Sequence, residues 1–301
     1  MGKKPNKKRA QRLRNERRLS KRLAEVQAGT HLAAHPNVVA LRTEVQQFFG
    51  SQFEETIEAT SGKSRFEIKL SASNDAVEHA RIWVAGRSDR AVEAHAHELL
   101  HLRLAVRGMP GVVAVRTSDA QDCALKKLRE LYPARADSVT RKFVNAIHEV
   151  VNLFEHSLFV GEFTNELGLD IEHFLYRSSP GDLEELDRIL PRDEELRPLT
   201  ISHWIIEWFR HFITATQGYA PVEERRYAAE AAKYAELNVP GFLEIQRRIQ
   251  VVIHESCDLT PSTYMDAVSE LCELTGTPRP SHVYALRRES NSVVVELSER
   301  E

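Results

Sequence analysis

Two spacings of apolar residues run through the chain, and each predicts its own kind of element. Residues 65–70 (RFEIKL) alternate between polar and apolar side chains, which is the period of a half-buried strand. The apolar segment 80–85 predicts a second strand, and the Ser-Asn-Asp sequence at 73–75 supplies turn chemistry between the two. Further strands are predicted at 111–117 and as a hairpin of 283–287 with 293–297.

Most of the remaining chain shows the three- and four-residue spacing of amphipathic helices. Trp204, Trp208 and Phe212 recur every fourth residue and predict a buried stripe. Taken together, the two spacings predict a helix-rich α+β fold with a small mixed sheet. Besides the helix that carries the motif described next, the predicted helices span 38–49, 120–132, 136–160, 183–190, 201–217, 223–237, 242–254 and 262–274.

One predicted helix carries the most specific motif of the chain. Ser88 supplies an N-cap, and Gly108 and Pro110 supply a stop, so this helix spans about five turns. In its middle lies the sequence HELLH at 97–101, which matches the H-E-x-x-H pattern. The motif therefore falls where a metal-binding helix needs it.

The spacing of the motif suits a metal ion. Residues four apart on a helix lie on one face, roughly 5–6 Å apart at Cβ, so His97 and His101 can bind one ion. Glu98 projects about a third of a turn away, where its carboxylate can take a proton from water. The alternative is an ordinary helix whose two histidines face solvent or are satisfied in the core. The motif favours zinc (Zn²⁺) with Glu98 as the catalytic general base.

A catalytic zinc usually has three protein ligands and one open position. Six residues after the second histidine, where metzincins have a third, this chain has Arg107, and no thermolysin-like glutamate motif occurs at 118–130. The predicted helix 136–160 offers His156 as the preferred third ligand and Glu155 as the alternative, with His148 as a weaker one. Asn152 shares a face with His156 and would orient that ligand by a hydrogen bond.

The same helix carries a polar row at 145, 149, 152 and 156, spaced four, three and four residues apart. A polar row on a largely apolar helix either faces solvent or meets partners inside the protein. A metal site would supply such partners, and both interpretations stay open at this point.

These features together resemble a group of uncharacterised bacterial zincin-like proteins. The resemblance rests on the HELLH helix, on Gly108-Met-Pro110 just after it, and on Asn152-x-x-x-His156, and it covers about 85–176. It implies a metallopeptidase that hydrolyses peptide or protein substrates. The order of a strand followed by the metal helix is also similar to zincin metalloproteases, whose edge strand pairs with extended substrate. That similarity implies that backbone groups of 82–85 bind peptide.

Composition sets the class and the compartment. With 42% hydrophobic and 28% charged residues among 301, the chain is typical of a soluble globular protein. No run of about 18 apolar residues predicts a membrane span. The three cysteines are far apart and odd in number, so neither a disulfide framework nor a C-x-x-C site is indicated, and a cytoplasmic location is expected.

Charge is concentrated at the beginning of the chain. Residues 1–22 contain eleven Lys or Arg and one acidic residue, whereas the remainder has 30 basic and 43 acidic residues. Residues 1–30 are therefore predicted to be a flexible basic arm, residues 31–180 a zincin-like metal-binding core, and residues 181–301 a helical C-terminal portion. A polybasic arm can bind nucleic acid through its phosphates. The alternative to a peptidase is thus a non-catalytic zinc protein whose arm contacts nucleic acid or a protein partner.

Overall fold

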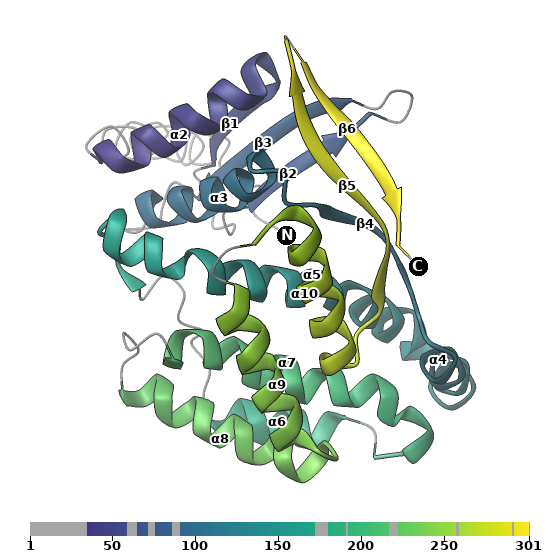
Figure 1. Ribbon diagram of the computed structural model, residues 1–301. Coiled ribbons are helices and arrows are strands. Elements are labelled where there is room, and N and C mark those ends of the chain that lie inside the picture. Colours follow the sequence, from purple (N-terminus) through teal and green to yellow (C-terminus); the bar gives the residue numbers. More distant parts are fainter. Residues whose placement is uncertain are drawn as a thin grey trace, which may run out of the picture. The chain divides into compact units, whose positions relative to one another are not determined.

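The computed structural model describes residues 35–58, 65–71, 76–85, 91–171, 180–190, 192–216, 222–256, 259–290 and 292–300 (Figure 1). Contacts divide the chain into two compact units. The first unit comprises Met1–Arg107 with Arg287–Val295, and the second comprises Gly108–Leu286 with Glu296–Glu301. The predicted basic arm and the predicted N-cap Ser88 lie outside the described residues, and the predicted boundary at residue 180 falls inside the second unit.

The first unit is built on a mixed three-stranded sheet. Its strands are β1 (Phe53–Glu58), β2 (Arg65–Leu70) and β3 (Val77–Ala85), in the order β1-β3-β2. β3 pairs in parallel with β1 and antiparallel with β2. The alternation at 65–70 is confirmed as β2. β1 was not among the predicted strands.

Two helices of the first unit, α2 (Pro36–Phe49) and α3 (Ala91–Val106), lie side by side and contact this sheet (Figure 1). The short 3-10 turn η1 (Gly50–Gln52) joins α2 to β1. α2 buries one apolar stripe at the expected three- and four-residue spacing: Val38, Leu41, Val45 and Phe49. The predicted small mixed sheet beside the motif helix is therefore present.

The motif helix ends for the predicted reason. α3 stops at Val106, and Gly108 follows with a φ of +82°, a conformation that costs glycine little and other residues more. Pro110 comes next, and β4 (Gly111–Arg116) begins directly after it. This end fixes the length of helix available to the motif.

The second unit is mainly helical. A buried core holds Trp204, Trp208 and Phe212, so the stripe predicted from their spacing is confirmed. α5 and α7 contact each other, and α7 runs beside α8. The helical elements are α4 (Asp119–Leu131), α5 (Pro133–Gly161), the π-helical turn η2 (Glu162–Glu166), α6 (Pro180–Ile189), the 3-10 turn η4 (Glu194–Leu196), α7 (Arg197–Thr216), α8 (Val222–Asn238), α9 (Phe242–Glu255) and α10 (Pro261–Thr275).

The predicted C-terminal hairpin is present as β5 (Arg279–Glu289) and β6 (Ser292–Glu299), which join β4 in a second sheet of order β4-β5-β6. β4 and β5 are antiparallel. Within the described part of the chain, no helix is long and apolar enough to cross a membrane.

Candidate metal centre

The two histidines of the motif lie together on α3. His101 is buried and His97 is half-buried, and their Nε2 atoms are 3.0 Å apart. Their rings have centroids 4.9 Å apart. One helical turn between the two positions produces this geometry.

Strand β2 supports the second histidine. The ring of Phe66 stacks on His101, with centroids 5.2 Å apart and an angle of 19° between the ring planes. Phe66 also donates its backbone N–H to the carboxylate of Glu98. β2 therefore fixes both the second histidine and the predicted base.

Glu98 is buried, with 8% of its surface exposed. Burial raises the pKa of its carboxyl group, while the charge of His101 and the backbone N–H of Phe66 lower it, and the resulting pKa is about 7. Desolvation dominates because a buried carboxylate loses its hydration.

The third candidate comes from a different helix. His156 is buried on α5, and its ring meets that of Phe159 edge-on at 5.6 Å. Among the described residues, one group of His, Cys, Asp or Glu side chains can hold a metal ion: His97, His101 and His156. Their ligand nitrogens all lie within 4.8 Å of one another.

The other candidates on α5 are placed differently. The Tyr264 hydroxyl donates a hydrogen bond of 2.7 Å to Glu155, so this carboxylate is engaged with α10. Neither Glu155 nor His148 belongs to the group of three histidines. Asn152 is half-buried. Within the described part of the chain, its side chain makes no hydrogen bond that would orient His156.

The donor set fits a transition metal. Three imidazoles are the ligands of several catalytic zinc sites, and imidazole suits zinc, copper, iron and nickel. Tetrahedral zinc with Zn–N bonds of about 2.1 Å places two nitrogens about 3.4 Å apart, close to the 3.0 Å between His97 and His101. The group supplies three ligands, which leaves a fourth position for water or substrate.

The expectation that backbone groups of 82–85 bind peptide is wrong for Ile82 and Trp83. β3 is the central strand, and these two residues pair with β1 on one side and β2 on the other, whereas Val84 and Ala85 pair with β1. A strand paired on both sides has no free edge for another strand. Both β1 and β2 form edges of the sheet, and β2 is the one that contacts His101 of the motif.

One polar cluster near the motif has no counterpart among the predictions. His95, 2% exposed, lies 2.7 Å from Glu55 through its Nε2, and Arg42 donates to the same carboxyl group. Burial raises the pKa of Glu55, but His95 and Arg42 outweigh it and the net pKa is lowered. This cluster ties α3 to β1 and α2. Its members are 53 positions apart at most, and no local spacing connects them.

Comparison of the chain with protein-family models, with curated proteins and with solved structures finds no match. Conclusions about function therefore rest on the geometry of the chain itself.

Proposed function

We propose that the protein is a zinc-dependent hydrolase that cleaves peptide bonds. The observation that carries the proposal is the group of His97, His101 and His156, with ligand nitrogens within 4.8 Å of one another. Glu98 adds the acid–base group, because it follows the first of these histidines and its carboxylate lies near His101. The fold adds nothing to the proposal, since a fold by itself does not fix a function.

Each side chain has a defined task in this proposal. A zinc ion held by the three histidines would supply a Lewis acid that polarises a carbonyl and makes water more acidic. Glu98 accepts a proton from the attacking water and then gives it to the nitrogen of the leaving amine. Phe66 holds the Glu98 carboxylate through its backbone N–H and packs on the ring of His101.

The substrate backbone is proposed to lie along β2. The backbone N–H of Phe66 donates to Glu98, which indicates that it does not donate to β3. In an antiparallel pair of strands, residues alternate between facing the partner strand and facing away from it, so the backbone groups of Ile68 also face away from β3. An extended peptide can add to such an edge through main-chain hydrogen bonds.

The engagement of Glu155 favours a catalytic over a purely structural metal. A structural zinc is closed by a fourth protein ligand. Glu155, the alternative ligand predicted from the sequence, accepts the hydroxyl of Tyr264 through one of its carboxylate oxygens. The non-catalytic alternative, in which the basic arm recruits nucleic acid, rests on residues outside the described part of the chain.

The first experiment is elemental analysis of the purified protein beside His101→Ala, His156→Ala and His148→Ala. We expect one zinc per chain in the wild type and in His148→Ala, which changes a histidine of the same helix outside the group. We expect loss of zinc in the other two variants. Zinc retained in His156→Ala would remove the third ligand from the proposal.

The second experiment separates catalysis from metal binding. Glu98→Gln keeps the shape of the side chain but removes the proton acceptor. We expect this variant to retain zinc and to lose about 10²–10⁴-fold in turnover of a fluorogenic peptide library. Full activity in Glu98→Gln would show that Glu98 is not the base.

A further inference from the structure

The polar row on α5 continues away from His156 and forms one wall of a pocket in the second unit. Asn145 and Glu149 line this pocket together with Lys142, one turn earlier on the same face. α7 supplies the facing wall with His203, Glu207 and Arg210. The pocket has a volume of about 420 Å³, within the range of small-molecule sites.

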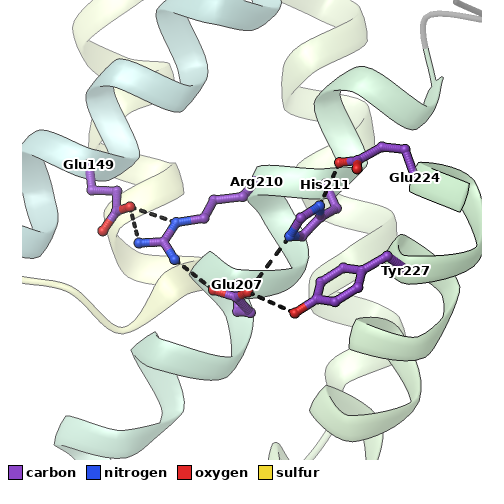
Figure 2. A network of polar contacts seen from close by, with 6 residues as sticks. All are labelled: Glu149, Glu207, Arg210, His211, Glu224 and Tyr227. Atoms are coloured by element: carbon purple, nitrogen blue, oxygen red, sulfur yellow. Dashed lines mark hydrogen bonds and ion pairs between the residues drawn. The ribbon is translucent and has the colours of Figure 1, made fainter. Parts of the chain in front are cut away.

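A network of charged groups holds the polar walls (Figure 2). Arg210 donates to Glu149 through Nε at 2.7 Å and to Glu207 through Nη1 at 2.6 Å. Tyr227 donates to the same Glu207 at 3.3 Å. Figure 2 shows Arg210 between the two carboxylates, so its charge is already neutralised. This network joins α5, α7 and α8 and fixes Glu149 and Glu207.

Other polar groups of the pocket remain available for a ligand. In the part of the chain that the structure describes, no hydrogen-bond or ion-pair partner is recorded for Lys142, Asn145 or His203, nor for the second oxygen of Glu149. Burial lowers the pKa of His203, and the charges of Arg210 and Lys142 lower it further. The charges of Glu149 and Glu207 raise it, but the net pKa is lowered. A neutral imidazole can donate through one nitrogen and accept through the other.

The charges of the walls are balanced and separated. Lys142 and Arg210 offset Glu149 and Glu207, so the lining carries no net charge and does not favour a simple anion or cation. The unpaired ammonium of Lys142 and the spare oxygen of Glu149 stand seven residues apart on α5, about 10 Å between their Cα atoms. Ala146, Leu186 and Ile206 supply an apolar surface in the same pocket.

We propose that this pocket binds a linear zwitterion with a carboxylate at one end, an ammonium at the other and an aliphatic spacer between them. Lys142 and Asn145 would take the carboxylate, and Glu149 would take the ammonium. The spacer would pack on Ala146 and Leu186. This site is separate from the histidine group and does not rest on the proposed hydrolase activity.

Calorimetric titration of the full-length protein with a series of ω-amino acids tests the proposal. ε-Aminocaproate has a long spacer, γ-aminobutyrate a shorter one and glycine almost none; none of them contains a peptide bond to cleave. We expect affinity to fall in that order. We also expect caproate and hexylamine, which each lack one charge, to bind about tenfold or more weaker than ε-aminocaproate.

Variants locate the binding site. Lys142→Met removes the charge of an exposed side chain while keeping most of its length, and should weaken the binding of ε-aminocaproate about tenfold or more. Asn145→Phe should block the pocket. Lys126→Met, which removes an exposed lysine on α4, and His101→Ala should both bind like the wild type.

The proposal is overturned if no ligand of the series binds saturably, if glycine binds as well as ε-aminocaproate, or if Lys142→Met binds unchanged. Loss of binding in His101→Ala would place the ligand at the histidine group instead and would equally overturn it. A wild-type protein that contains no zinc but binds ε-aminocaproate would contradict the proposed hydrolase function and leave the proposal for this pocket standing.

Discussion

His211 provides the sharpest test of the energetics of the second unit. Its side chain is fully buried, and both ring nitrogens face carboxylates: Nδ1 lies 2.5 Å from Glu224 of α8, and Nε2 lies 3.6 Å from Glu207 of α7 (Figure 2). Its ring also lies 4.2 Å from that of Tyr227. The Nδ1 contact with Glu224 is a hydrogen bond, whereas the Nε2 contact with Glu207 is an ion pair, so the charged imidazolium is the form that pairs with both carboxylates.

The electrostatics agree with this geometry. Burial lowers the pKa of His211, but its interactions with Glu207 and Glu224 outweigh this effect, and the net pKa is raised. Burial likewise raises the pKa of Glu207, while His211 and Arg210 lower it below its usual value. Each group thus stabilises the charged form of its neighbour.

We expect His211→Gln to destabilise the protein by about 3 kcal/mol. Removing one partner of a buried ion pair costs about 3–5 kcal/mol, and the low end applies because Glu207 keeps Arg210. For a folded unit of this size, 1 kcal/mol corresponds to roughly 2–4 °C, so Tm should fall by roughly 6–12 °C. The matched control is His282→Gln, at an exposed histidine, where a change within about 0.5 kcal/mol is expected.

The same group predicts how stability depends on pH. Because the folded-state pKa of His211 lies above the unfolded value of 6.5, its stabilisation is fully present below pH 6.5 and is lost as pH rises through the folded-state value. Thermal unfolding followed by circular dichroism should therefore show a decline of Tm with rising pH in the wild type that His211→Gln lacks. Equal slopes in both proteins, or a Tm shift no larger than that of His282→Gln, would refute the imidazolium bridge.

Three further predictions follow from single contacts. Tyr264→Phe removes the hydroxyl that donates to Glu155 and should cost about 1–2 kcal/mol in chemical denaturation, with zinc content unchanged; loss of zinc would instead make Glu155 part of the metal site. Gly111→Ala should lower stability by about 1–3 kcal/mol, because a Cβ there overlaps the ring of Tyr284, and unchanged stability would mean that this ring moves freely. Deletion of 1–22 should abolish a salt-sensitive gel shift with DNA or RNA, and a shift that persists would assign nucleic-acid binding to another part of the chain.

Local sequence patterns determined the helices, most strands and two of the three histidines. His97 and His101 are four residues apart, and a helix brings such positions together whatever surrounds it. The strand at 65–70 and the stripe of Trp204, Trp208 and Phe212 were predictable for the same reason, since each depends on a short period along one element. The glycine that ends the motif helix is likewise a local signal.

Only the tertiary structure decided which distant side chains meet. His156 and Glu155 are neighbours on α5 and project in different directions, so packing alone could place the first with His97 and His101 and the second with Tyr264. The order of the strands was also decided by the tertiary structure. The apolar run at 80–85 predicts a buried strand, but it does not predict that this strand lies between β1 and β2. In the bridge through His211, the contact with Glu207 follows from a four-residue spacing on α7, whereas no local spacing encodes the contact with Glu224 of α8. Periodicity describes one element at a time, whereas these contacts depend on how several elements pack.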